Sequence, residues 1–141
     1  MGDTVSILEK LKILKKYIDE LEGWSKISFE EYEKDLIKKG ALERKMQLIV
    51  DITVDINNMI LKKLKKETSS DYFNTFINLA EANVIEYDFA LKIAPSTGLR
   101  NILVHQYEKV EDRKVYNSIN EMKEEYKEYR NIIVKYVENN L

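Results

Sequence analysis

The sequence has no cysteine and a single histidine, His105, among its 141 residues. Without thiols the chain cannot form disulfides, iron–sulfur clusters or thiolate zinc sites. With one imidazole, it cannot build a metal site from several histidines of one chain. Four glycines and one proline are also few for this length, which favours long helices over strands joined by tight turns. We therefore expect a helical protein that uses neither metal nor cofactor.

Long apolar runs and a strong net charge are absent as well. No segment approaches the roughly 18 apolar residues of a membrane span. The first residues, MGDTVSILEKLK, lack the apolar core of a signal peptide. We therefore expect a cytoplasmic protein. The net charge is −2, so nucleic-acid binding would depend on a local patch rather than on the field of the whole molecule.

Apolar residues at helical spacing run through most of the chain. Near the start, intervals of four and three separate Ile7, Leu11, Leu14, Ile18 and Leu21. Residues 41–67 contain neither Gly nor Pro and predict the longest helix, whose apolar stripe is wide enough to contact neighbours on several sides. The same spacing from Val115 to Val137 predicts a long C-terminal helix.

Capping residues predict where the other helices begin and end. Ser28, with Glu31 three residues later, forms a capping-box pattern before a short helix. Further helix starts are predicted at Asp3 or Thr4, at Ser70 or Asp71, at Val84, and at Ser96 or Thr97. The expected helix ends are Gly23, Ala82 and Ile93. The last of these follows from Pro95, because the residue before a proline avoids the helical region.

These segments predict an all-α fold in one domain spanning residues 1–141, a bundle of about four main antiparallel helices plus shorter ones. The apolar stripes allow two interpretations. They could face one another within a monomer, or part of them could form the interface of a two-fold dimer.

The stretch GLRNILVHQYEKV, residues 98–110, contains Arg100, His105 and Tyr107. On a continuous helix Arg100 and Tyr107 would lie within about 20° of each other, and His105 would lie about 140° from Arg100. The apolar residues 102–104 point in several directions around that helix. They therefore predict an embedded helix whose polar groups are partly enclosed.

Histidine transfers protons near neutral pH, and arginine holds phosphate oxygens with a planar fork. Together they provide what metal-independent RNA cleavage needs, although one of each makes a sparse site. A two-fold dimer would supply both an acid and a base. A hydrogen-bonded structural histidine is the alternative. Asp51 and Asp55 share one helix face and could orient Arg100 or His105 across a dimer; otherwise they are solvated or form salt bridges.

The segment RNILVHQY, residues 100–107, fits the pattern R-x-x-x-x-H-x-Y, with polar Asn101 directly after the arginine. This pattern resembles the signature of HEPN domains, in the form of their HepT toxin branch. GALERKMQLIVDITVDINNMI, YFNTFINLAEANVI and LKIAPSTGLRNILVHQYEKVEDRKVYNSI are similar to the central helix, the following helix and the motif region of that branch. The resemblance covers about residues 40–119.

The resemblance implies an all-α homodimer with a metal-independent endoribonuclease site at its interface. Such proteins are toxins of type VII HEPN/MNT toxin–antitoxin pairs. Their partner is a minimal nucleotidyltransferase, MntA, which neutralises the toxin by transferring AMP. By this resemblance Arg100 would bind the scissile phosphate, His105 would be the acid or base, Asn101 would support the site, and Tyr107 would accept AMP. The alternative is a non-catalytic HEPN module that binds a nucleotide or scaffolds the nucleotidyltransferase.

Overall fold

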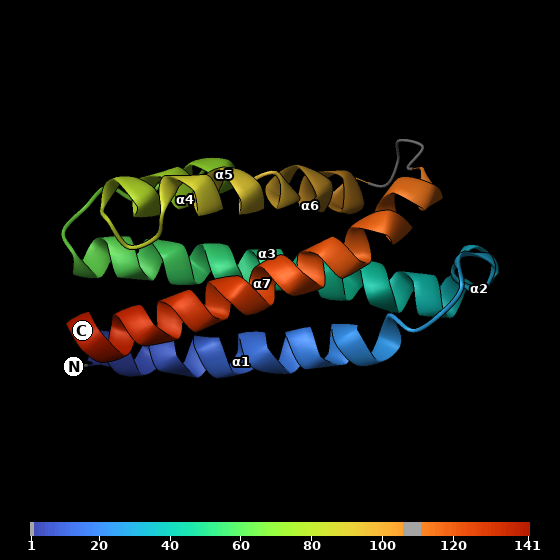
Figure 1. The fold of residues 1–141 in the computed structure, drawn as a ribbon, viewed down its shortest axis with the longest axis horizontal. Coiled ribbons are helices and arrows are strands. Elements are labelled where there is room, and N and C mark those ends of the chain that lie inside the picture. Colours follow the sequence, from blue (N-terminus) through green and yellow to red (C-terminus); the bar gives the residue numbers. More distant parts are fainter. Residues whose placement is uncertain (1, 106–110) are drawn as a thin grey trace.

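The computed structural model describes residues 2–105 and 111–141 (Figure 1). Over these two ranges the secondary structure is entirely helical, which confirms the all-α prediction. The helices are α1 (Gly2–Trp24), α2 (Phe29–Lys34), α3 (Leu36–Lys63), α4 (Tyr72–Glu81), α5 (Tyr87–Ile93), α6 (Ser96–Val104) and α7 (Asp112–Asn140). None of the described helices combines the length and the apolar character needed to cross a bilayer.

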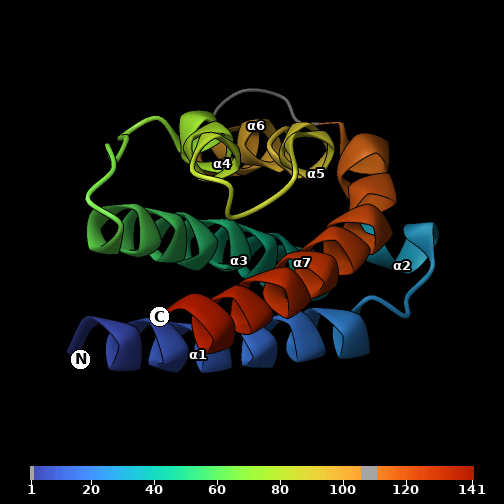
Figure 2. The ribbon, with the colours of Figure 1, turned by 60° about the vertical axis from the view of Figure 1, so that its left-hand side comes forward.

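The helices form layers around α3. In Figures 1 and 2 the short helices α4, α5 and α6 cover one side of α3, α1 lies on the opposite side, and α7 crosses α3 obliquely. Helix α3 contacts α1, α2, α4, α6 and α7. The motif helix α6 therefore lies in the outer layer, with α3 beneath it.

The apolar stripes predicted from spacing form the core. The five residues of the α1 stripe are at most 3% exposed, and Met46, Ile49 and Ile56 of α3 are fully buried. Because α3 is buried from several sides, its wide apolar stripe fits its central position. Val115 and Val137 are buried at either end of α7. These predictions are confirmed.

Side-chain caps set several helix starts. Ser28 accepts a hydrogen bond from the Glu31 N–H, and Asp71 accepts one from the Asn74 N–H, so both predicted caps are confirmed. Asp35 accepts from the N–H groups of Ile37 and Lys38, each at 3.1 Å. Helix α3 therefore begins at Leu36, and the predicted start at Ala41 is wrong.

Other predicted boundaries are also wrong. Asp3 and Thr4 already lie inside α1, which continues through Gly23 to Trp24. Ser96 and Thr97 do not cap α6. Their hydroxyls instead donate to the Ile93 and Ala94 carbonyl oxygens at the end of α5, at 2.7 and 2.8 Å. Both carbonyls lie at a helix end, where carbonyl oxygens lack an intrahelical partner and nearby hydroxyls can supply one. The Ala94 carbonyl also accepts from the Thr97 N–H, at 3.0 Å.

Two helices end in left-handed turns at residues other than glycine. Lys65 has φ 58° and Asn83 has φ 62°. After each, the next N–H reaches back to the preceding helix, Lys66 to the Leu61 carbonyl at 2.8 Å and Val84 to the Leu79 carbonyl at 2.9 Å. This is the Schellman arrangement. It ends α3 at Lys63 rather than near residue 67, and it delays α5 to Tyr87.

Candidate active site

The motif segment is not one continuous helix. Helix α6 ends at Val104, and His105 follows with φ −98° and ψ 57° while its N–H donates to the Asn101 carbonyl oxygen at 3.1 Å. The predicted angle between Arg100 and His105 assumed a helix that continues past His105, and that assumption is wrong because α6 ends at Val104. The angle itself stays a prediction. Tyr107 lies outside the described residues, so its predicted position beside Arg100 stays a prediction.

Helix α6 is less enclosed than predicted. Only one of its three central apolar residues, Leu103, is buried, while Ile102 and Val104 are 51% and 36% exposed. Asn101 and His105 are also exposed. The reason is that α6 packs on α3 from one side and forms part of the outer layer. The polar groups of the motif consequently lie at the surface of this chain.

Side chains of α3, α4 and α6 together hold Arg100. Its Nε donates to Asp51 Oδ1 at 2.7 Å. Its guanidinium carbon lies 4.7 Å from the centre of the Tyr72 ring, and its Nη1 donates to Asn101 Oδ1 at 3.3 Å. Its side chain is 20% exposed. A guanidinium has five N–H donors, so one held this way still offers donors to a phosphate.

Tyr72 completes the support of Arg100. Its hydroxyl donates to the same Asp51 Oδ1 at 3.1 Å. Burial and the nearby Asp51 carboxylate raise the pKa of Tyr72, so its hydroxyl stays protonated and remains a donor. Asp51 thus binds two donors, and Arg100 lies between its carboxylate and an aromatic ring. Sequence reasoning missed Tyr72, because nothing in the motif points to a side chain on another helix.

The two predicted carboxylates have different surroundings. Asp51 contacts Arg100 within the chain, and its predicted role across a dimer stays a prediction. Asp55 lies one turn further along α3 and pairs with Lys10 of α1 at 3.8 Å, with its side chain 64% exposed. The structure therefore brings Asp51, but not Asp55, to the motif. Across residues 2–105 and 111–141, no three His, Cys, Asp or Glu side chains are grouped so as to hold a metal ion.

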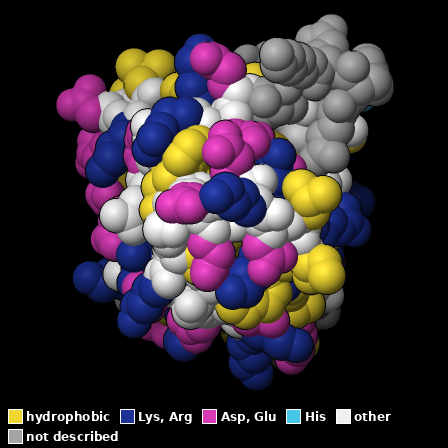
Figure 3. All heavy atoms as spheres, turned by 90° about the vertical axis from the view of Figure 1, so that its right-hand side faces the viewer, with side chains coloured by type: hydrophobic (Ala, Val, Ile, Leu, Met, Phe, Trp, Pro, Cys, Tyr) yellow, Lys and Arg dark blue, Asp and Glu magenta, His cyan; other side chains and the backbone are white. Residues whose placement is uncertain are grey.

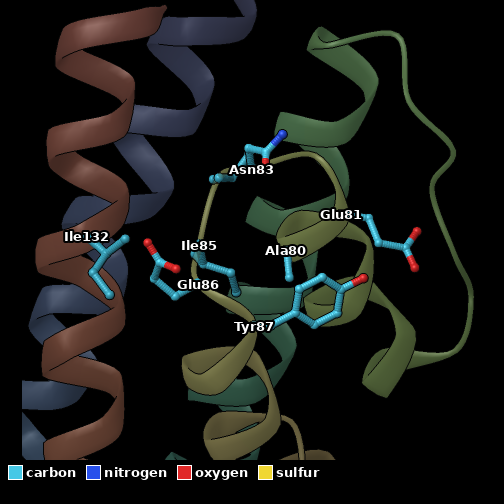
Figure 4. A pocket seen from close by; sticks show the side chains of 8 residues that line it. Ala80, Glu81, Asn83, Ile85, Glu86, Tyr87 and Ile132 are labelled. Carbon is cyan, nitrogen blue, oxygen red and sulfur yellow. The ribbon is translucent and has the colours of Figure 1, made fainter.

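A groove of about 690 Å³ lies beside this cluster. Arg100 and Asn101 line it together with the residues at the starts of α4 and α6. Another hollow, of about 490 Å³, lies between the α4–α5 turn and α7 and is lined by Glu81, Glu86 and Tyr87 (Figure 4). It contains none of the motif residues. Of these two hollows, the first is therefore the one that motif residues line.

The end of the molecule near α2 carries charges of both signs side by side (Figure 3). Lys38 pairs with Glu31 at 3.2 Å, and Lys39 of α3 pairs with Asp112 of α7 at 2.6 Å. Intermixed charges attract a polyanion weakly. This face therefore gives less support to RNA binding than the Arg100 cluster does.

Comparison with known families identifies relatives over nearly the whole chain. The family model described as "Ribonuclease HepT-like" matches residues 7–135. The tRNA nuclease HepT of Aphanizomenon flos-aquae is 34% identical over 135 residues, covering 96% of this chain and 92% of that protein. A putative RNase of Archaeoglobus fulgidus is 31% identical over 115 residues, covering 79% of this chain and 86% of that protein.

Solved structures show the same fold. The tri-AMPylated HEPN toxin of Shewanella oneidensis, in complex with its MNT antitoxin, superposes with a TM-score of 0.82 at 20% identity, covering 92% of this chain and 96% of that one. YutE of Bacillus subtilis, a cytosolic protein of unknown function, gives 0.82 at 18% identity, covering 97% and 92%. At such identities the likeness concerns the fold alone, and it confirms the predicted HEPN type.

Proposed function

The chain belongs to the HepT-like ribonuclease family, and from that premise we propose that it is the toxin of a HEPN/MNT toxin–antitoxin pair and cleaves RNA without a metal ion. The observation that carries this proposal is Arg100, held between Asp51 and Tyr72 at the edge of a groove and on the same segment as His105. The family model spans that segment.

Each residue has a defined part in this reaction. Arg100 donates hydrogen bonds to the non-bridging phosphate oxygens and stabilises the charge that grows on them. Asn101 helps to hold the guanidinium. An imidazole takes the proton of the 2′-hydroxyl, whose oxygen then attacks the phosphorus. The bond to the 5′-oxygen breaks, an imidazolium returns a proton to that oxygen, and a 2′,3′-cyclic phosphate remains.

A second copy of the chain would complete the site. The reaction uses one imidazole as base and one as acid, and each chain contains a single histidine. Ile102 and Val104 are exposed apolar residues on the helix that ends at His105. A two-fold dimer that covers them would bring both motifs to one cleft. The homodimer is therefore part of the proposal.

Tyr107 is the proposed target of the antitoxin. It stands two residues after His105, within the matching motif. Transfer of AMP onto its hydroxyl would place a phosphodiester anion next to the motif, where Arg100 would bind it in place of RNA. The AMPylated state of the Shewanella toxin supports this step. The partner would be an MntA-like minimal nucleotidyltransferase.

One experiment tests the proposal through two readouts. The chain is purified alone and after co-expression with the candidate nucleotidyltransferase, and both samples are assayed on labelled tRNA in EDTA. The chain alone should cleave. The co-expressed chain should carry AMP on Tyr107 by peptide mass spectrometry and should not cleave. His105→Ala should reduce cleavage by 100-fold or more, on the order of a lost general acid–base.

Glu108→Ala, one residue after Tyr107, is a matched control and should cleave like the wild type. Cleavage that persists in His105→Ala would contradict the catalytic assignment. A wild-type chain that binds tRNA without cleaving it would favour the non-catalytic HEPN module. AMP found only on another tyrosine would refute the assignment of Tyr107.

A further inference from the structure

The groove beside Arg100 is larger than a single phosphate needs. Its volume of about 690 Å³ falls within the range of small-molecule sites, roughly 300 to 1,000 Å³. One side is formed by the start of α4 and the residues before it, and the other by the turn that leads into α6. Arg100 and Asn101 belong to the same lining. A group attached to a phosphate on Arg100 would therefore extend into this groove.

The groove has an apolar surface suited to a flat ring. Phe73 lines it and is 39% exposed, whereas Phe76 on the same helix is fully buried in the core. Pro95 and Gly98 line the groove from the α6 side. A Cβ added to Gly98 would meet no atom within 4 Å, so the space beside it is open. Unpaired RNA bases stack on exposed aromatic side chains in such surroundings.

Two polar side chains could recognise the edge of that ring. The Asp71 carboxylate accepts one N–H, from Asn74 at 3.4 Å, and retains further acceptor capacity. The Asn101 amide oxygen accepts from Arg100, which leaves the amide nitrogen as a donor. An acceptor and a donor together match the edge of a base that offers an amino group next to a ring nitrogen, as adenine and cytosine do.

The charges in the groove separate the two parts of a nucleotide. Arg100 attracts the phosphate, while the Asp71 carboxylate repels it and accepts from an amino group. The phosphate therefore belongs at Arg100 and the base near Phe73 and Asp71.

We propose that this groove is a nucleobase subsite for single-stranded RNA, in which a base stacks on Phe73 while its phosphate binds Arg100. Asp71 and Asn101 bind the edge of the base. The inference rests on the proposed function for the identity of its occupant. It adds a substrate-recognition role that the motif does not contain.

The first test measures the contribution of the base without any cleavage. Adenosine 5′-monophosphate and ribose 5-phosphate are titrated separately into the ¹⁵N-labelled protein, and binding is followed by NMR. The wild type should bind the nucleotide on the order of tenfold more tightly, because only the nucleotide has a base to stack. Phe73→Ala should remove this difference without changing the affinity for ribose 5-phosphate, and Phe73→Tyr should retain it.

Two further variants make the first test independent of Phe73. Gly98→Gln should also remove the preference, since its side chain enters the groove from the other side and the backbone has room for it. Val5→Ala is the matched control, because Val5 is a 58% exposed apolar residue of α1 outside the groove lining. Equal affinity of the wild type for both ligands would overturn the subsite.

The second test identifies the occupant. A short single-stranded RNA whose 2′-hydroxyls are methylated cannot be cleaved, and its binding is measured by fluorescence anisotropy. Phe73→Ala should weaken binding about tenfold. Unchanged RNA affinity, alongside a lost preference for the mononucleotide, would overturn RNA as the occupant. A change of oligomeric state in Phe73→Ala by sedimentation would assign Phe73 to a subunit contact and overturn the inference.

Neither test depends on catalysis. Failure of the proposed function would appear elsewhere, as a wild-type chain that leaves unmodified tRNA intact.

Discussion

Arg100 is a surface arginine whose position is set by other side chains. Asp51 binds its Nε, and the Tyr72 ring lies against its plane. A free arginine loses considerable rotamer entropy when it binds a phosphate, and contacts made beforehand reduce that loss. The guanidinium is therefore already oriented before the proposed RNA substrate binds. Tyr72 contributes twice, through its ring and through its bond to Asp51.

Substitution of Tyr72 tests this orientation at the level of one residue. Tyr72→Leu removes the ring and should lower kcat/KM for RNA cleavage roughly 2- to 30-fold, the range expected for a cation–π contact. Tyr72→Phe keeps the ring and should lose less. The measurement is initial-rate kinetics, with circular dichroism to confirm the fold. Phe29→Leu, which removes the ring 3.7 Å from Arg113, is the control and should leave kcat/KM unchanged.

The interpretation requires a lower kcat/KM for Tyr72→Leu than for Tyr72→Phe. Equal activity of Tyr72→Leu and the wild type would show that the ring does not position Arg100.

At the scale of one element, α7 contains a carboxyl group that is buried close to a second carboxylate. Glu125 is 5% exposed and lies one turn after Glu121. Burial, followed by the charge of Glu121, raises the pKa of Glu125 to about 7, against the opposing effect of Lys92 on α5. Lys92 also pairs with Glu128 at 3.0 Å. Glu125 therefore keeps its proton to a higher pH than an exposed glutamate does.

The stability of the protein should consequently fall as pH rises. The folded state retains the proton of Glu125 to about pH 7, whereas the unfolded chain loses it near pH 4.5. Folding therefore binds a proton between these values, and the free energy of unfolding decreases through that window by up to roughly 3 kcal/mol. Glu125→Gln should remove this decrease, and urea unfolding at pH 5 and pH 8 measures it.

The exposed Glu124→Gln serves as control for the charge change on α7 and should follow the wild type at both pH values. If the stability difference between Glu125→Gln and the wild type were the same at pH 5 and pH 8, the proposed titration would be wrong.

At the scale of the whole molecule, the proposed function depends on one surface of the protein rather than on its net charge. The net charge of −2 supplies no overall attraction for RNA. The layer formed by α4, α5 and α6 carries Arg100 and also exposes apolar side chains, among them Ile102, Val104 and Leu91. A face that joins apolar surface to the candidate site suits a second copy better than solvent.

Ile102→Glu tests the role of this face. A buried, unpaired carboxylate should weaken the dimer by roughly 30-fold or more in Kd, and cleavage should fall with the dimer population. Sedimentation velocity and the tRNA assay measure the two effects. Ile13→Glu changes a 41% exposed residue on α1, the opposite layer, and is the control. An Ile102→Glu variant that sediments like the wild type would contradict the proposed interface.

Much of the fold was predictable because its signals are local. The stripe from Ile7 to Leu21 and the caps at Ser28 and Asp71 predicted helices that the structure contains. Some of the errors fall where the backbone departs from what the residue type suggests. Lys65 takes a left-handed conformation that sequence patterns associate with glycine, and α6 ends at Val104 without a glycine or proline.

By itself, the sequence determined the helical class, most of the buried stripes and the segment that carries Arg100 and His105, because periodicity, capping and motif spacing are properties of adjacent residues. Only the tertiary structure decided that Asp51 and Tyr72 hold Arg100, that Asp55 forms an ion pair with Lys10, and that α6 lies at the surface beside a groove. These facts depend on how α3, α4 and α6 pack, and side chains from separate helices meet only after that packing has formed.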